Sequence, residues 1–357
     1  MDEASTSEIK LADAFGRVIE DLRISVTDRC NFRCLYCLPE TEAAANFYMN
    51  RGAAAPSPDK PIYRSWVKRT QILSFEEITR VCEIGARLGI RKIRITGGEP
   101  LLRRDLTTLI ESISKIPGIE DIALTTNGFG FIRLGDGLKS AGLKRITFSL
   151  DSLERENFKR ITGIDGLEEV KKGINLALKL NLQPVKINAV LIRGVNDHEI
   201  EALIQYAKDL GAIVRFIEFM PLDSRRAWQR DLVVPANEIL ETAKKQFQLV
   251  PINPTHPSET ARSWGFENQS GGIGLISPIT EPFCGNCNRL RLTADGQIRT
   301  CLFSQSEHNL KRLLRNGSND EKITDWLRAT VWGKEKGHHV GSQSFSPPAR
   351  SMSWIGG

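Results

Sequence analysis

Residues 21–37 read DLRISVTDRCNFRCLYC, a largely apolar stretch that leads into three closely spaced cysteines, Cys30, Cys34 and Cys37. Three thiolates on one short loop can hold three corners of a four-iron cluster, because iron–sulfur clusters are normally held by cysteine sulfur. One iron of such a cluster lacks a protein ligand, much as a catalytic zinc site keeps one open position. The spacing therefore predicts a redox site that receives a substrate or cofactor, rather than a structural metal.

The composition is that of an ordinary soluble globular protein, with 357 residues, 40% of them hydrophobic and 26% charged. This length allows one large domain or two modest ones. No apolar run is long enough to cross a bilayer, and neither a signal-peptide core nor a basic transit sequence follows the acidic N-terminus. We therefore expect a cytoplasmic protein that does not associate with membranes.

Charge and cysteine content narrow the choice of partner. The net charge of +6 is mild for this length and does not indicate a nucleic-acid partner, whereas a local group of arginines would suit an anionic small molecule. Seven cysteines cannot all form disulfides, and six of them fall into two tight groups, which predicts metal binding. The seventh, Cys82, lies at helical spacing with apolar residues and is predicted to be a buried core thiol.

Up to about Met220 the chain alternates strand-like and helical segments. The predicted strands are 22–27, 92–96, 122–126, 145–151, 185–192 and 214–220. Amphipathic patterns predict helices over 74–88, 106–113, 167–180 and 199–210, the first of which begins with a capping box of Ser74 and Glu77. Six βα units in series imply parallel strands with helical crossovers, arranged as an open sheet or a barrel.

The residues that stand out lie where such folds bind ligands, at the C-terminal ends of the strands. The cysteine triplet follows the first predicted strand, residues 97–100 (Gly-Gly-Glu-Pro) the second and residues 125–128 the third. Residues 149–151 end the fourth strand and Met220 the sixth, whereas the fifth carries Lys186 near its start. The two glycines permit close approach of the backbone to a ligand, although a plain turn is the alternative.

We divide the chain at residue 220, into parts 1–220 and 221–357. Residues 41–71 form a long insertion rich in Ala, Pro and Arg, predicted to be a surface excursion near the first cysteine loop. The C-terminal part carries predicted helices at 236–246, 309–315 and 320–332 and a hairpin that turns at 294–297. Composition alone predicts a frayed terminus over 351–357.

The second cysteine group is Cys284 and Cys287, followed after thirteen residues by Cys301. A structural zinc knuckle is one interpretation, with His308 as the nearest fourth ligand. A second open cluster that contacts the substrate is the other, and the first triplet favours it.

Basic residues recur in segments that otherwise look buried. Arg289 and Arg291 share one face of a strand beside the second cysteine group and form a fork that suits phosphate oxygens, unless they are a solvated face. Five more basic residues lie in predicted strands: Arg23, Lys92, Arg94, Lys186 and Arg215. Buried cations need partners, so their convergence predicts a polyanionic ligand. Buried ion pairing with Asp151 or Glu218 is the alternative.

The chain resembles a known family at several of these motifs. The cysteine spacing, with Tyr36 before the last cysteine, resembles the radical S-adenosylmethionine (SAM) superfamily. Residues 21–30, 93–100 and 215–220, the second cysteine group with its two arginines, and the terminal Gly356-Gly357 together resemble the GTP 3′,8-cyclase family, lyases of molybdenum cofactor biosynthesis. The insertion at 41–71 is longer than the connection usual in that family and touches no matched residue.

The resemblance implies an α/β fold, an incomplete (β/α)6 TIM-like barrel with a C-terminal α+β extension that carries a second Fe-S cluster. It implies two 4Fe-4S clusters, one on Cys30, Cys34 and Cys37 and one on Cys284, Cys287 and Cys301. SAM would contact Tyr36, Gly98, Ser149 and Met220. GTP would contact Arg23, Lys92, Arg94, Thr125, Lys186, Arg215, Arg289 and Arg291. Catalytic roles would fall to Arg289, Arg291, Gly356 and Gly357.

The activity implied by the resemblance is conversion of GTP to 3′,8-cyclo-7,8-dihydro-GTP by a 5′-deoxyadenosyl radical. The implied partners are a flavodoxin- or ferredoxin-like electron donor and the downstream cyclic pyranopterin monophosphate synthase, with a homodimer as one option. Two alternatives stay open. Another two-cluster radical SAM maturase would carry more C-terminal cysteines, and a non-catalytic zinc and Fe-S protein would leave the incomplete first cluster unexplained.

Overall fold

The computed structural model describes residues 10–48, 60–222, 228–342 and 345–356. One sheet of twelve strands runs through this part of the chain in the order β12-β11-β10-β1-β2-β3-β4-β5-β6-β9-β8-β7. Its strands are β1 (Asp21–Ser25), β2 (Lys92–Thr96), β3 (Asp121–Thr126), β4 (Arg145–Ser149), β5 (Lys186–Leu191), β6 (Ile213–Glu218), β7 (Leu249–Ile252), β8 (Arg262–Phe266), β9 (Gly272–Ile276), β10 (Arg289–Leu292), β11 (Gln297–Arg299) and β12 (His308–Asn309).

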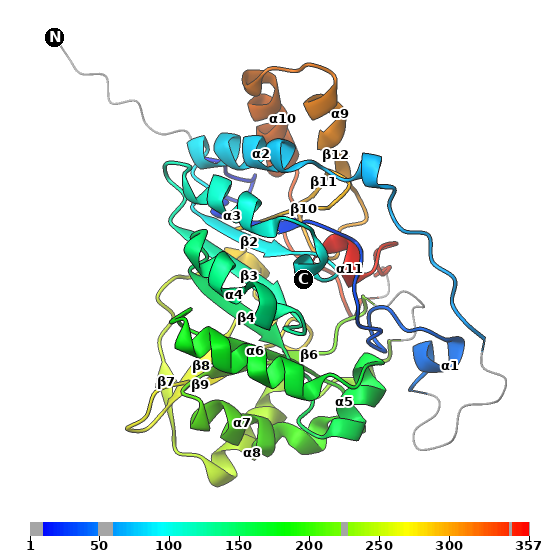
Figure 1. Cartoon of the computed structure of the whole chain (residues 1–357), viewed down its shortest axis with the longest axis vertical. Helices are drawn as coiled ribbons and strands as arrows, with labels where there is room; N and C mark the ends of the chain where they lie inside the picture. The colour runs from blue at the N-terminus through cyan, green and yellow to red at the C-terminus, as the bar shows by residue number, and fades with distance from the viewer. Residues whose placement is uncertain (1–9, 49–59, 223–227, 343–344, 357) are drawn as a thin grey trace.

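The helices connect and cover these strands. They are α1 (Glu42–Ala45), α2 (Phe75–Arg87), α3 (Leu106–Ser114), α4 (Phe131–Ser140), α5 (Arg155–Thr162), α6 (Leu167–Lys179), α7 (Ile200–Asp209), α8 (Ala236–Gln246), α9 (Leu310–Arg315), α10 (Asp320–Trp332) and α11 (Met352–Ile355). Figure 1 shows α2, α3, α4 and α6 along one side of the sheet. No helix in the described ranges combines the length and the apolar character that crossing a membrane would require.

Strands β1 to β6 are neighbours in sequence order, and each adjacent pair is parallel. The C-terminal part continues the sheet at both ends, because β10 adds in parallel to β1 and β9 adds in parallel to β6. The outermost strands, β12 and β7, are not partners, so the described sheet stays open. The predicted fold class, an incomplete (β/α)6 barrel with a C-terminal extension, is confirmed. The boundary at residue 220 stays a prediction.

Buried apolar side chains of the strands pack against the helices and form the main core. Helix α2 shows why the sequence predicts its place correctly: Ser74 caps it, and the capping box with Glu77 is present in both directions. Cys82 is fully buried in this helix, as predicted for a core thiol. The side chains of β1 to β6 that face the helices thus form the core, and the side chains on the opposite face are left to line the cavities.

Sequence reasoning missed several elements. Helix α4 follows Gly130 and contains Gly135, and glycine lowers helix propensity. A Cβ on Gly135 would meet the ring of Phe131 at 2.9 Å, so tertiary packing selects glycine there. Strand β9 is also rich in glycine. Its Gly274 lies opposite Arg215, and a Cβ at Gly274 would press on the Arg215 side chain at 3.1 Å.

The C-terminal tail corrects one expectation. Residues 351–357 were predicted to fray from composition, yet α11 is a short helix with Ser353 and Ile355 buried. An ion pair between Arg350 and Asp295 anchors it, with an Nη1–Oδ1 distance of 2.9 Å. Figure 1 shows α11 near the middle of the view. Gly357 lies outside the described residues.

The insertion at 41–71 returns to the first cysteine loop. Thr41 and Pro61 form an isolated antiparallel bridge, and the Val67 amide donates to Asp28 Oδ2 at 2.7 Å. Of this segment, residues 49–59 lie outside the described ranges. The flanks that the structure describes lie near the cysteine loop, as predicted.

Candidate active site

Two adjoining cavities open at the inner face of the sheet. The smaller, of about 140 Å³, is lined by the first cysteine triplet, and the larger, of about 470 Å³, by the second triplet and a set of basic residues. Thr125 and Met352 line both cavities. The larger volume is in the range of small-molecule sites.

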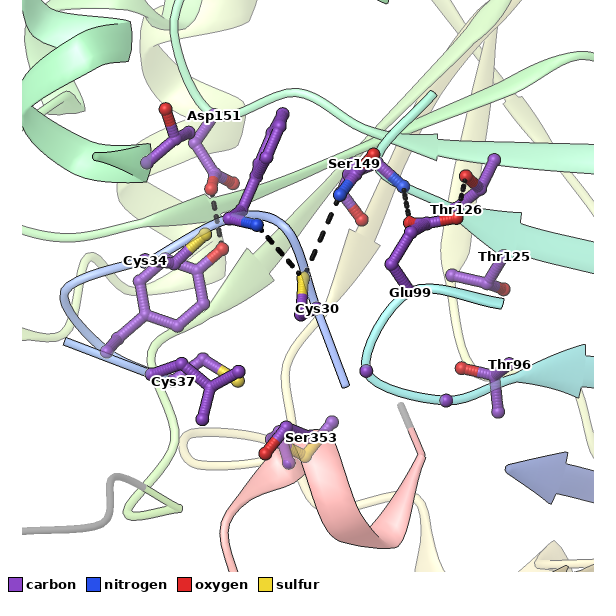
Figure 2. A pocket seen from close by; sticks show the side chains of 18 residues that line it. Cys30, Cys34, Cys37, Thr96, Glu99, Thr125, Thr126, Ser149, Asp151 and Ser353 are labelled. Atoms are coloured by element: carbon purple, nitrogen blue, oxygen red, sulfur yellow. Dashed lines mark hydrogen bonds between the residues drawn. The ribbon is translucent and has the colours of Figure 1, made fainter. Parts of the chain in front are cut away.

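The first cysteine loop follows β1 directly and is held in shape by its own backbone. The amides of Cys37 and Leu38 both donate to the Cys34 carbonyl, at 3.0 and 2.9 Å. The Leu35 amide donates to the Ile161 carbonyl at the end of α5, at 3.0 Å. In Figure 2 the three cysteines, all with free thiols, lie across the cavity from Glu99 and Thr96. The loop thus presents three sulfurs to one space.

Gly97 and Gly98 have a role that the sequence did not predict. A Cβ on Gly97 would lie 2.7 Å from the Thr27 carbonyl oxygen, and one on Gly98 would clash with the Arg29 backbone. The Gly98 and Glu99 amides donate to the carbonyls of Thr27 and Arg29, each at 2.7 Å. The glycines therefore let this turn pack on the cysteine loop itself, and their close approach to a ligand stays a prediction.

Carboxylates surround the first triplet. Glu99 accepts from the Thr126 hydroxyl at 2.6 Å and the Asn127 amide at 2.7 Å, and burial raises its pKa to about 7. Asp151 accepts from the Tyr36 hydroxyl at 2.6 Å, and burial raises its pKa to about 6. Burial, with Glu99 next in effect, raises the pKa of Cys30 to about 12. These surroundings disfavour bare thiolates and suit a bound positive charge.

The larger cavity is lined by rows of cations that the strand register creates. Arg23 on β1 lies opposite Arg94 on β2 and Arg291 on β10. Two residues earlier, Asp21 lies opposite Lys92 and Arg289. Residues two apart on a strand share a face, so both rows point into the cavity. Lys186, Arg215 and Arg145 extend the basic lining across β4 to β6.

These cations outnumber the carboxylates that line the same cavity, Asp21 and Glu259. Burial, followed by the charges of Arg215, Arg145 and Arg94, lowers the pKa of Lys186 to about 7. Burial likewise lowers the pKa of Arg23 well below its usual range. Its buried Nε has no hydrogen-bond partner among the described residues, and its ion pair with Asp21 Oδ2 is long, at 4.0 Å. An anion in this cavity would supply what the protein lacks.

Asp151 and Glu218, which the sequence suggested as ion-pair partners of these cations, have other partners in the structure. Asp151 accepts from Tyr36 and from the Val190 amide, and Glu218 accepts from backbone amides and from the hydroxyl of Thr280. Neither has an ion pair with a basic side chain within the described ranges.

The second triplet lies beside the cations Arg289 and Lys334, with the Glu335 carboxylate also near Cys301. Burial alone would raise the pKa of Cys287, yet the charges of Arg289 and Lys334 lower it to about 6. Burial raises the pKa of Cys301.

Zinc held by four ligands with Zn–S bonds of about 2.3 Å would bring the sulfurs to about 3.8 Å from one another. In the described ranges, only Glu154, His198 and Glu199 form a group of three donors within 4.8 Å of one another. The three sulfurs of the second triplet are therefore not all as close together as zinc would hold them.

The histidine predicted as a zinc ligand lies elsewhere. His308 is on β12 with its ring 6.5 Å from that of Trp326, and it is not among the residues that line the cavity. His338 lines the cavity instead, and its ring is tilted against that of Phe303 with the centroids 4.8 Å apart. The sequence gives no signal that distinguishes His338, because its neighbours in the chain follow no recognisable spacing.

Helix α11 lies between the two triplets. Ser353 lines the smaller cavity together with Cys37, and the Gly356 carbonyl accepts from Arg291 Nη1. Gly356 has a φ of +78°, and a Cβ there would meet Thr96 at 2.8 Å. Helix α11 thus borders the smaller cavity through Ser353, and Gly356 after it contacts the basic lining of the larger cavity through Arg291.

Comparisons with known proteins decide the family. A sequence model described as Radical SAM superfamily matches residues 24–207, and one described as Molybdenum Cofactor Synthesis C matches residues 212–340. A GTP 3′,8-cyclase of Rhodopirellula baltica is 41% identical over 99% of this chain and 93% of its own length. A GTP 3′,8-cyclase of Syntrophomonas wolfei is 44% identical over 97% of this chain and 100% of its own. The chain belongs to the GTP 3′,8-cyclase family.

A solved structure supports the fold of this family member. Streptococcus suis SuiB bound to S-adenosylmethionine superposes with a TM-score of 0.59 at 12% identity, covering 91% of this chain and 69% of that chain. At this identity the likeness concerns the fold alone. As a radical SAM protein, the GTP 3′,8-cyclase family member uses SAM and an iron–sulfur cluster.

The structure brings most predicted contacts of the cyclase family together. Tyr36, Gly98 and Ser149 line the smaller cavity, whereas Met220 lines the larger one. The predicted GTP contacts all line the larger cavity: Arg23, Lys92, Arg94, Thr125, Lys186, Arg215, Arg289 and Arg291. Sequence reasoning missed Arg145, which pairs with Asp121, and Asn188, which accepts from Arg215 Nε at 2.9 Å. Both follow from strand alternation once the register is known.

Proposed function

We propose that this protein is a radical SAM GTP 3′,8-cyclase, which converts GTP to 3′,8-cyclo-7,8-dihydro-GTP in the first step of molybdenum cofactor biosynthesis. One observation carries the proposal: the row formed by Arg94, Arg23 and Arg291 faces a cavity that also contains the second cysteine triplet. The triphosphate of a purine nucleotide would bind the three arginines, and its base would lie at the second cysteine triplet.

The smaller cavity suits SAM. Its sulfonium and ammonium outweigh its one carboxylate, so SAM is a cation, and Glu99 and Asp151 provide the opposite charge. In this proposal Cys30, Cys34 and Cys37 would hold the first 4Fe-4S cluster, which would leave one iron available to SAM. Tyr36, Gly98 and Ser149 border SAM, and Met220 reaches it from the larger cavity.

The larger cavity suits GTP. The guanidinium rows bind the triphosphate, because charged and forked donors match phosphate oxygens. Cys284, Cys287 and Cys301 would hold the second 4Fe-4S cluster, which would offer an open coordination position to the base of GTP. Thr125 and Met352 border both cavities, so the ribose of a GTP bound this way lies where the cavities meet.

When bound, the first cluster and SAM supply a 5′-deoxyadenosyl radical that takes a hydrogen atom from the ribose. The protein's part is to position the reacting groups and exclude water. Arg291 donates to the Gly356 carbonyl and holds the C-terminal tail against β1 and β2, next to the row of arginines proposed to bind the triphosphate. Arg289 stands over the Phe283 ring at 5.0 Å, which orients its guanidinium.

The remaining partners belong to the same proposal. A flavodoxin- or ferredoxin-like protein would reduce the clusters, and the product would pass to a cyclic pyranopterin monophosphate synthase. We propose a cytoplasmic location and leave a homodimer as an option to be measured.

Anaerobic reconstitution tests the proposal. The protein is loaded with iron and sulfide, its iron is counted, and it is incubated with SAM, dithionite and GTP. We expect about eight irons per chain and formation of 5′-deoxyadenosine together with a cyclised GTP product. A protein that forms no GTP-dependent 5′-deoxyadenosine is not a cyclase. Zinc bound at Cys284, Cys287 and Cys301 after strictly anaerobic preparation would remove the second cluster from the mechanism.

A further inference from the structure

Two buried cations outside the substrate cavity tie together the segments that carry the second cysteine triplet. Arg17 precedes β1 and Lys334 follows α10, so both are distant in sequence from Cys284 and Cys287. Both side chains are buried, with residue exposures of 8% and 3%. Burying a charge without partners is costly, which makes their contacts informative.

Arg17 is held by one carboxylate and gives its other bonds to carbonyl oxygens. Its Nε donates to Asp13 Oδ2 at 2.5 Å. Its Nη1 donates to the Cys284 carbonyl at 2.8 Å and the Lys336 carbonyl at 2.9 Å, and Nη2 donates to the Glu335 carbonyl at 2.5 Å. Asp13 in turn accepts from the Phe15 and Arg17 amides, at 2.9 and 3.0 Å. The guanidinium thus joins the Cys284 turn to residues 335–336.

Lys334 joins the other two cysteine segments. Its Nζ donates to the Arg289 carbonyl at 3.1 Å and to the Thr300 carbonyl. These carbonyls lie two residues after Cys287 and one residue before Cys301. Glu335 adds a bond, because its Oε2 accepts from the Thr300 hydroxyl at 2.7 Å. Each of the three cysteine segments is therefore bound to residues 334–336, directly or through Arg17.

The buried positive charge of Lys334 indicates that this network surrounds a negatively charged group. In the described ranges, Lys334 makes no ion pair with a carboxylate within 4.0 Å, although it is buried beside the second triplet. The Glu335 carboxylate lies nearby on the Thr300 hydroxyl, and three thiolates on a cluster would add further negative charge. Residues that orient metal ligands from behind typically change metal affinity or activity by about 10–100-fold when replaced.

We infer that Asp13, Arg17, Lys334 and Glu335 form a positioning network for the second cluster, which sets the three cysteine segments and supplies positive charge behind it. This inference rests on the proposed second 4Fe-4S cluster. Neither Arg17 nor Lys334 touches the substrate cavity, so they act on GTP only through the cluster and Arg289.

Two substitutions test the network: Arg17→Lys keeps the charge but loses the fork, and Lys334→Met keeps the length but loses the charge. We expect both to retain the first cluster and SAM-dependent 5′-deoxyadenosine formation without GTP. Second-cluster iron or GTP-dependent turnover should fall about 10–100-fold. In any second cluster that Lys334→Met retains, the midpoint potential should shift to lower values, because a nearby positive charge favours the reduced state. Lys334→Arg should restore the potential.

Matched controls separate these effects from general damage. Arg155→Lys changes an exposed Arg–Asp pair, Arg155 with Asp165, and Lys322→Met removes an exposed lysine of α10. Both should leave the clusters unchanged. If Arg17→Lys and Lys334→Met lose both clusters, Thr300→Val decides, since it removes only the hydroxyl that donates to Glu335 and should weaken the second cluster selectively.

The outcomes are distinguishable. A wild-type protein with two clusters, and variants with unaltered second-cluster spectra, potential and turnover, would overturn the network and leave the cyclase proposal standing. A wild-type protein that never acquires a second cluster would overturn the two-cluster proposal and the network with it. Selective loss or a lowered potential in the variants supports both.

Discussion

The two cysteine triplets look alike in sequence and differ in their electrostatic surroundings. The first lies beside Glu99 and Asp151, and burial raises the pKa of Cys30 to about 12 and of Cys37 to about 11. The second lies beside Arg289 and Lys334, whose charges lower the pKa of Cys287 to about 6 despite burial. The spacing of cysteines therefore predicts a cluster, and the charges around it indicate the ligand: cationic SAM at the first and anionic GTP at the second.

Exchanging cysteines in either triplet gives the largest expected effect. Replacing Cys30, Cys34 and Cys37 by serine should lower SAM cleavage on the order of 10³-fold or more, because no radical is generated. Replacing Cys284, Cys287 and Cys301 should leave SAM cleavage and abolish only cyclisation. Product analysis by liquid chromatography separates the two results. Cys82→Ala, at the buried core thiol, is the matched control and should keep both activities.

Removing the arginines beside the second triplet should have the next largest effect. Arg289→Ala and Arg291→Ala should retain both clusters and lose about 10²-fold in GTP turnover, because each removes a charged donor from the anion site. Iron counts and steady-state kinetics measure this, and Arg155→Ala at the exposed pair serves as the control. Unchanged turnover would show that the phosphate assignment is wrong.

Lys186 should make GTP binding depend on pH. Its pKa of about 7 in the free protein should rise when phosphate binds, so GTP binding takes up a proton. Affinity is then highest below pH 7 and falls as pH increases through 7, by up to about tenfold per unit. Lys186→Arg stays charged throughout and should flatten this dependence of KM. An equally steep profile in the variant would exclude Lys186 as the titrating group.

Tyr36→Phe should have the smallest effect and act only on the first site. It removes the 2.6 Å donor to Asp151 and should weaken SAM binding by about 1 kcal/mol, roughly fivefold, without changing the KM for GTP. Tyr206→Phe is the control, since the buried Tyr206 hydroxyl has no hydrogen-bond partner in the described structure. A change in GTP affinity would mean that the two sites are not separate.

Strand positions made the fold and much of the site predictable. Alternation places Arg23, Arg94 and Arg291 on inward faces, and the order of the βα units brings the strands together. What sequence reasoning missed depends on tertiary contacts. Glycines in α4 and β9 reflect packing against Phe131 and Arg215, and the α11 tail is ordered by Arg350 and Arg291. Arg17 and Lys334 bond mainly to carbonyl oxygens, which leave no trace in a sequence pattern.

Electron paramagnetic resonance of the reduced, fully loaded protein tests the difference between the triplets most directly. Variants with serine in one triplet assign each cluster signal to its cysteines. SAM should then perturb only the signal of Cys30, Cys34 and Cys37, and GTP only that of Cys284, Cys287 and Cys301. A GTP effect confined to the first cluster, or a second triplet without an iron signal in intact protein, would contradict the division of roles.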